Sequence, residues 1–187
     1  MNLILASASP RRSELLASAG IRFTVRVSQV EERHVPGEDA WQYVKRLAEA
    51  KARTIESTPG EVVLGADTVV VVDDHILEKP ADHADAARML RLLSGRRHQV
   101  ITGICLRGLN RITVDAETTE VRFVSLSEAE IDDYVRTGEP MDKAGGYAIQ
   151  GLASKFIDRV EGCYFNVVGL PVALVYQKLK EFEGMHE

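Results

Sequence analysis

The sequence has few cysteines and no long apolar run. Cys105 and Cys163 are its only thiols among 187 residues, and they form neither a CxxC pair nor a metal-ligand spacing. Such thiols are typical of a reduced, cytoplasmic protein. No apolar stretch approaches the roughly 20 residues of a membrane span. The opening MNLILASASPRR is apolar first and basic afterwards, the reverse of a secretory signal. We therefore expect a cytoplasmic protein with no membrane partner.

Basic charge is also scarce. The chain carries 23 Lys and Arg against 28 Asp and Glu, a formal charge of −5. Duplex binding depends on phosphate neutralisation, so we expect no nucleic-acid partner. A small anionic ligand stays compatible, because a local basic pocket can lie in an acidic protein. With 45% hydrophobic and 27% charged residues, the chain has ordinary globular composition. Its length predicts a single domain over residues 1–187.

Several common catalytic motifs are missing as well. The sequence contains no GxSxG, GxxxxGK[ST] or GxGxxG, and its histidines show no ligand spacing such as HExxH. Serine hydrolase, Walker-type NTPase and Rossmann dehydrogenase functions therefore lose their main support.

Hydrophobic periodicity predicts strands and helices that alternate early, with a long hairpin in the middle of the chain. We expect helices at residues 10–18, 39–55, 82–93, 127–136 and 171–182. We expect strands at 3–6, 21–27, 62–64, 69–72, 99–106, 111–123 and 156–160. This pattern favours an α/β fold with a long mixed β-sheet flanked by helices.

The first candidate site lies at residues 7–12, Ser-Ala-Ser-Pro-Arg-Arg, between an expected strand and helix. Ser9 suits the N-cap and Pro10 the first helical position. Arg11 and Arg12 would oppose the helix dipole, at a cost of roughly 0.3–1 kcal/mol each, unless a bound anion reverses the sign. Amides, hydroxyls and guanidinium groups would then form a polyphosphate cradle. A solvated turn is the alternative.

The second candidate is Asp67, in the segment Gly65-Ala66-Asp67-Thr68, which interrupts the apolar run VVLGADTVVVV. An ionised carboxylate inside a buried strand is costly unless it is paired or bound to metal. This favours a functional carboxylate. The alternative is a bulge or turn, because the same four residues are also good turn formers.

Two further segments carry weaker signals. Carboxylates at Glu31-Glu32 suit Mg²⁺ or Mn²⁺, and lysines at positions 51 and 79 suit phosphate oxygens. Taken singly, the acidic pair is more simply a solvated turn and Lys51 more simply an exposed helix position. The glycine-rich stretch Asp142–Gly151 lets a backbone approach a ligand, and the Gln150 amide can pair with a base edge. A hairpin loop is the alternative there.

Taken together, these segments resemble the Maf proteins, a family of nucleoside triphosphate pyrophosphatases. The matching segments follow in order along nearly the whole chain. They are LASASPRRSELL at 5–16, VEE at 30–32, LAEAKA at 47–52, LGADTVV at 64–70, LEKP at 77–80, LSGRRHQVITG at 93–103, DKAGGYAIQG at 142–151 and GCYFNVVGLPV at 162–172. The branch that acts on dTTP and UTP is the most similar. The resemblance implies two lobes with an active-site cleft, and a homodimer.

The resemblance also implies the chemistry, which is hydrolysis of a nucleoside triphosphate to the monophosphate and pyrophosphate. Asp67 matches the family's proton acceptor, which would activate a water for attack at the α-phosphorus. Glu32 matches an acidic position near the metal and the water. Lys51 and Lys79 match lysines on the phosphate side. A divalent cation, Mg²⁺ or Mn²⁺, is the implied cofactor, with Asp67 or Glu32 as its ligand.

The remaining matched positions concern substrate binding. Ser7 and Arg12 match phosphate-binding positions. Arg11, Thr68 and Gln150 match positions linked to base choice in the dTTP/UTP branch. A carboxamide fits that role, because its oxygen can accept from pyrimidine N3–H while its nitrogen donates to the O4 carbonyl. Cytosine inverts this pattern.

Two other functions stay open. The first is a non-catalytic, nucleotide-sensing regulator of cell division, which would not need Asp67. The second is the same chemistry on N7-methyl-GTP, against which Gln150 and Thr68 argue.

Overall fold

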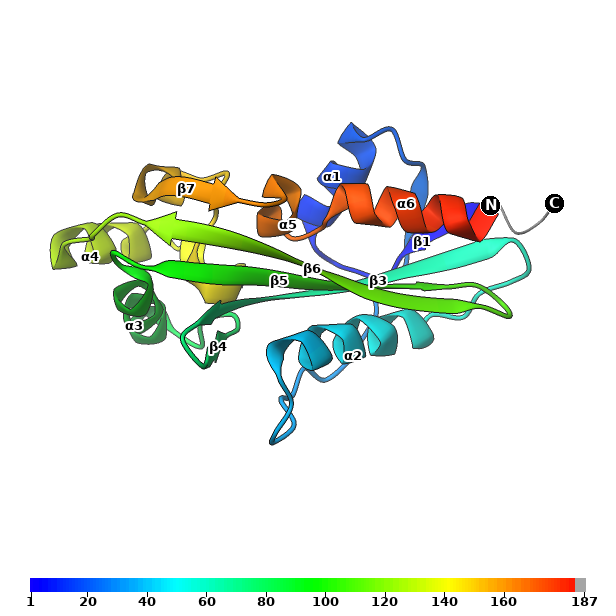
Figure 1. The fold of residues 1–187 in the computed structure, drawn as a ribbon, viewed down its shortest axis with the longest axis horizontal. Helices are drawn as coiled ribbons and strands as arrows, with labels where there is room; N and C mark the ends of the chain where they lie inside the picture. The colour runs from blue at the N-terminus through cyan, green and yellow to red at the C-terminus, as the bar shows by residue number, and fades with distance from the viewer. Residues whose placement is uncertain (184–187) are drawn as a thin grey trace. The chain divides into compact units, whose positions relative to one another are not determined.

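The computed structural model describes residues 1–183 of the chain. It contains a seven-stranded sheet in the order β2-β1-β3-β5-β6-β7, with β4 paired to β3 (Figure 1). The strands are β1 (Asn2–Leu5), β2 (Phe23–Val25), β3 (Glu61–Val72), β4 (His75–Leu77), β5 (Arg97–Arg107), β6 (Ile112–Phe123) and β7 (Ile157–Glu161). The helices are α1 (Pro10–Ser18), α2 (Ala40–Arg53), α3 (His83–Leu93), α4 (Glu128–Arg136), α5 (Tyr164–Val168) and α6 (Val172–Glu183). None of these helices is long and apolar enough to cross a membrane.

The sheet is mixed, as the sequence predicts. Strand β1 pairs in parallel with both β2 and β3. Strand β4 pairs antiparallel with β3, and β7 pairs antiparallel with β6. The α/β fold with a mixed sheet and flanking helices is therefore confirmed.

Strand β3 corrects one expectation. The sequence predicts two short strands separated at Gly65-Ala66-Asp67, but the structure has one continuous strand of 12 residues. Backbone pairing continues past the apolar start of the strand, since the Ala6 N–H donates to the Leu64 carbonyl at 2.8 Å. The turn alternative for this segment is wrong, because Asp67 stays in the strand with a buried cationic partner.

The chain divides into two compact units. Unit 1 comprises residues 1–67, 102–117 and the described chain from 169 onward, and unit 2 comprises residues 68–101 and 118–168. Strands β3, β5 and β6 contribute residues to both. The presence of two units agrees with the two lobes expected from the resemblance. That residues 1–187 form a single family domain stays a prediction.

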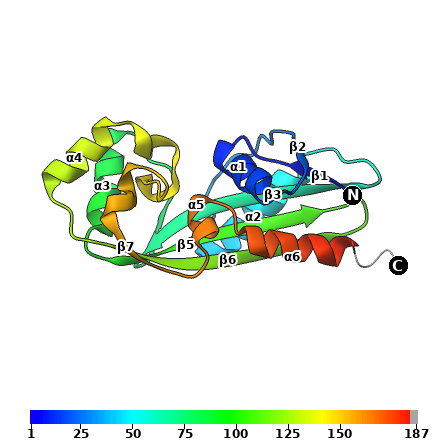
Figure 2. The ribbon, with the colours of Figure 1, turned by 90° about the horizontal axis from the view of Figure 1, so that it is seen from above.

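In unit 1, α2 covers one face of the sheet, and α1 and α6 cover the other (Figures 1 and 2). Helix α2 begins at a capping box, in which the Asp39 carboxylate accepts from the Gln42 N–H at 2.8 Å. Its backbone lies directly on the strands at two glycines. A Cβ on Gly65 would lie 2.1 Å from the Ala48 carbonyl oxygen, and a Cβ on Gly103 would lie 2.4 Å from that of Val44. These contacts fix the height of α2 above the sheet.

In unit 2, α3 and α4 pack against one another and against the strands (Figure 2). Both helices begin within one residue of their expected starts: the Asp82 side chain accepts from the Asp85 N–H, and Ser127 forms a capping box with Glu130. Three short 3₁₀ segments, Glu139–Asp142, Ala144–Gly146 and Leu152–Phe156, follow α4. The core of the unit includes Leu90 from α3 and Phe123 from β6.

Candidate active site

A carboxylate is buried in the middle of β3. Asp67 is only 6% exposed, and the ammonium group of Lys51 donates to its Oδ1 at 2.6 Å. The same Lys51 Nζ lies 2.6 Å from Glu32 Oε1. Lys51 is itself 8% exposed, so the expectation of an exposed helix position is wrong. Glu32 is exposed, as the solvated alternative predicts, but its carboxylate also pairs with Lys51.

Arg12 joins this cluster from the first turn of α1. Its Nε donates to the Gly169 carbonyl at 2.9 Å, and its Nη1 donates to the Ala66 carbonyl at 2.9 Å and to Ser7 Oγ at 3.2 Å. The alternative of a solvated turn is therefore wrong for Arg12. Its guanidinium fork ties α1 to β3 beside Asp67 and to the segment that leads into α6.

Ser7 follows β1 and is buried. Its Oγ accepts from the Ser9 N–H at 3.2 Å as well as from Arg12. A hydroxyl has two acceptor lone pairs and one donor, so its proton can be directed to a phosphate oxygen. Ser9 occupies the expected N-cap position without a side-chain cap bond, and Pro10 begins the helix. Arg11 lies beside Arg12 in the same turn and is half-buried.

Burial shifts the ionisation of the cluster. It raises the pKa of Asp67 above its ordinary value and outweighs the lowering by Lys51 and Arg12. Burial also lowers the pKa of Arg12, against the raising effect of Asp67 and Glu32. Two anions and two cations thus compensate one another. A carboxylate with a raised pKa is a better proton acceptor than an ordinary aspartate.

Three predicted site residues belong to unit 2. Thr68 follows Asp67 in β3, so its side chain points to the opposite face of the strand. Lys79 is exposed after β4, and Gln150 is exposed in a turn after the second 3₁₀ segment. The segment around Lys79 meets the glycine-rich stretch, because the Gly145 N–H donates to the Glu78 carbonyl at 3.0 Å. Within unit 2, the structure therefore brings these two motifs together.

Comparisons with known proteins identify the family of the chain. A family model described as Maf-like protein matches residues 2–182. The chain belongs to the Maf family. It is 57% identical to the dTTP/UTP pyrophosphatase of Koribacter versatilis, over 96% of this chain and 94% of that protein. It is 52% identical to the dTTP/UTP pyrophosphatase of Symbiobacterium thermophilum, over 96% of this chain and 93% of that protein. Among solved structures, the Staphylococcus aureus Ham1 protein matches at 18% identity with a TM-score of 0.45, covering 66% of this chain and 72% of that one.

The donor set of this Maf chain fits a hard divalent cation in its chemistry. Asp67 and Glu32 offer carboxylate oxygens that share one ammonium partner. Mg²⁺ is commonly bound by one or two carboxylates together with substrate phosphates. Within residues 1–183, no group of three or more His, Cys, Asp or Glu side chains is arranged to hold a metal. Most ligands of such a cation would therefore come from the substrate and water.

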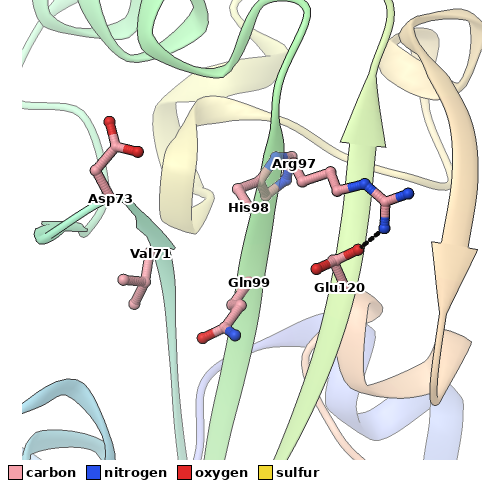
Figure 3. A pocket seen from close by; sticks show the side chains of 6 residues that line it. All are labelled: Val71, Asp73, Arg97, His98, Gln99 and Glu120. Atoms are coloured by element: carbon pink, nitrogen blue, oxygen red, sulfur yellow. Dashed lines mark hydrogen bonds and ion pairs between the residues drawn. The ribbon is translucent and has the colours of Figure 1, made fainter.

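A polar hollow of about 240 Å³ opens in unit 2 of the Maf chain (Figure 3). The Arg97 side chain extends to Glu120 there, while Gln99 and Val71 lie on the neighbouring strands. The hollow is lined by Val71, Asp73, Arg97, His98, Gln99 and Glu120, none of which is a predicted site residue.

Sequence reasoning missed the residues that set the height of α2. Gly65 and Gly103 touch no predicted substrate group, yet they allow the approach that delivers Lys51 to Asp67. The sequence does contain a signal for this close approach, because each glycine interrupts a β-branched apolar run. A glycine inside a strand often marks the close approach of another backbone.

Proposed function

We propose that this chain hydrolyses dTTP and UTP to the nucleoside monophosphate and pyrophosphate. The observation that carries the proposal is the cluster of Asp67, Lys51, Glu32 and Arg12, in which the buried Asp67 and Lys51 form an ion pair that Glu32 and Arg12 flank. Buried charges of this kind are expensive and typical of functional sites. The dTTP/UTP pyrophosphatases to which the chain is more than 50% identical supply the substrate class.

In the proposed mechanism, Asp67 takes a proton from the attacking water as the water reaches the α-phosphorus. An ammonium group has three donors. Lys51 therefore has one donor beyond its two carboxylate contacts to offer a phosphate oxygen. Ser7 and Arg12 bind the triphosphate from the α1 side, and Lys79 contributes a further positive charge. Positioning and charge compensation supply most of the catalysis in phosphoryl transfer.

A divalent cation, Mg²⁺ or Mn²⁺, would be held by Asp67 or Glu32 together with the phosphates, and it would screen the charge that develops on them. Base choice is assigned to Arg11, Thr68 and Gln150. The exposure of Gln150 supports this role, since its amide is open to a ligand. A homodimer and a cytoplasmic location stay predictions.

A product assay tests the proposal. Purified protein is incubated with Mg²⁺ or Mn²⁺ and, in separate reactions, with dTTP, UTP, CTP, ATP, GTP and N7-methyl-GTP. The pyrophosphate and orthophosphate released are measured separately. We expect pyrophosphate from dTTP and UTP. An Asp67→Asn preparation made in the same way controls for contaminating phosphatases.

Each other outcome would point to a different function. Preferred turnover of N7-methyl-GTP would keep the chemistry and overturn the base assignment. Orthophosphate as the first product would move the attack away from the α-phosphorus. Nucleotide binding with no turnover, in wild type and variant alike, would favour the sensing regulator.

A further inference from the structure

Gln150 lies in a β-turn that is built tightly. The Gly151 N–H donates to the Ala148 carbonyl at 3.0 Å, which closes a four-residue turn with Gln150 at its third position. Ile149 within the turn is buried, as is Tyr147 just before it, while Gln150 is exposed. The turn therefore presents one side chain outward from an anchored backbone.

Two side chains from a neighbouring segment hold both ends of this turn. The Ala148 N–H donates to Tyr134 Oη at 3.1 Å. The Tyr134 hydroxyl in turn donates to Glu139 Oε1 at 2.8 Å. At the other end, the Leu152 N–H donates to both oxygens of Glu139, at 3.0 and 3.2 Å. A single Tyr–Glu pair thus binds the residue that opens the turn and the residue that follows it.

The closing glycine of the turn shows how close this pair lies. A Cβ on Gly151 would lie 2.4 Å from each carboxylate oxygen of Glu139, so that carboxylate occupies the space of a side chain. Tyr134 is 3% exposed, and its burial raises the pKa of its hydroxyl above the ordinary value. The hydroxyl therefore stays protonated and can donate to Glu139 throughout the neutral range.

We propose that Glu139 and Tyr134 are positioning residues that set base discrimination by fixing the turn of Gln150. This inference rests on the proposed function, in which Gln150 contacts the base. A carboxamide distinguishes uracil from cytosine only if its oxygen and nitrogen meet the correct edge atoms. A site that rejects a wrong base by leaving polar groups unpaired needs those groups held in place.

The test uses the full chain with Glu139→Gln and Tyr134→Phe. In Glu139→Gln, one of the two oxygens that accept from the Leu152 N–H becomes an NH₂ donor, and the negative charge that strengthens the bond from Tyr134 is lost. We expect kcat/KM for UTP to fall about tenfold, mainly through KM, with a smaller change for CTP. The UTP-to-CTP ratio should approach that of Gln150→Ala. Asp133→Asn is the matched control in the same helix, because Asp133 is exposed and pairs with Arg136 at the surface; it should leave the ratio unchanged.

A double variant separates positioning from general destabilisation. In a Gln150→Ala background, Glu139→Gln should have little further effect on the ratio, since it acts through Gln150. An undiminished effect, or an equal loss for UTP and CTP, would overturn the proposal.

Two measurements do not depend on hydrolysis. Amide exchange at Ala148 and Leu152 should accelerate in both variants, and calorimetry should show UMP losing more affinity than CMP. Unchanged exchange would overturn the proposed restraint. If wild type releases no pyrophosphate, the proposed function fails, and these two measurements still decide the positioning role.

Discussion

Each unit of the molecule buries a polar cluster. The two clusters differ in how they offset the free energy that burying ionisable groups costs. In unit 1, Lys51 and Asp67 are both nearly inaccessible and form an ion pair at 2.6 Å. In unit 2, His98 is 2% exposed and its Nε2 lies 2.8 Å from the Tyr147 hydroxyl. Burial lowers the pKa of His98 to about 3, so this ring is neutral at physiological pH.

This difference in charge indicates which cluster has a chemical role and which has a packing role. A buried group loses its charge when no partner compensates it, as His98 does beside Phe123 and Tyr147. A cluster that keeps its charges must surround each with opposite ones, which costs desolvation and gives little net stability. Such a cluster can transfer a proton and bind phosphate. We therefore assign catalysis to the charged cluster and a packing role to the neutral one.

The largest effect should follow from Asp67→Asn. The asparagine keeps the size of the side chain and can still accept from Lys51, but it cannot take a proton from water. We expect kcat/KM for dTTP to fall about 10²- to 10⁴-fold, the usual contribution of a general base. Because burial raises the pKa of Asp67, wild-type activity should decline on the acid side at a pH above the 3.8 of an ordinary aspartate.

His98→Gln is the counterpart in the neutral cluster. It should leave turnover near the wild-type value once the protein is folded. Comparable losses of turnover in the two variants would contradict the division between the clusters.

The second effect concerns the packing of α2 on the sheet. Gly103→Ala places a methyl group 2.4 Å from the Val44 carbonyl oxygen. Overpacking of this kind costs about 1–3 kcal/mol. Because α2 also carries Lys51, turnover should fall together with the midpoint of urea denaturation.

Gly108→Ala is the matched control in the same unit. A Cβ there would lie 3.3 Å from the ring of Phe182 and 4.0 Å from the Arg111 carbonyl oxygen. Its stability and activity should stay closer to wild type. If Gly103→Ala lowered stability and left turnover unchanged, the position of α2 would not limit the site.

Local signals in the sequence predicted much of the fold. Helix α1 spans Pro10–Ser18 as expected, and the helices expected from residues 39, 82 and 127 each begin one residue later, after a side-chain cap. These elements depend on residues a few positions apart, which a sequence shows directly. The strand expected at 21–27 is only Phe23–Val25, because its pairing with β1 extends over three residues.

The sequence predicts which residues form the candidate site but not which residues they contact. The ordered motifs identify Ser7, Arg12, Lys51 and Asp67. The hydrogen bond from Arg12 to Gly169, in contrast, joins positions 157 residues apart. The burial of Lys51 likewise depends on glycines in strands that pack beneath α2. Such placement is decided by tertiary packing, which propensity and periodicity do not contain.

A third effect tests the neutrality of His98 through pH. The folded-state pKa is about 3 and the ordinary value is 6.5, so below pH 6.5 only the unfolded chain binds this proton. The contribution of His98 to the free energy of unfolding is therefore largest above pH 6.5. It falls by about 1.4 kcal/mol for each pH unit below that value, down to the folded-state pKa. His98→Gln should therefore have a shallower stability profile between pH 6 and about 4. Urea denaturation of wild type and variant at each pH measures the difference.

The smallest effect belongs to an ion pair outside both clusters. Arg91 and Glu128 meet at 2.7 Å with side chains 48% and 66% exposed, a distance close to that of Lys51 and Asp67. Water already solvates both surface groups, so a double-mutant cycle in urea should give a coupling of about 0.2–1 kcal/mol, reduced further by salt. A coupling above about 2 kcal/mol would mean that contact distance decides the strength of these pairs. A weak, salt-sensitive coupling would agree with the hydration of both surface groups, which the buried Lys51 and Asp67 lack.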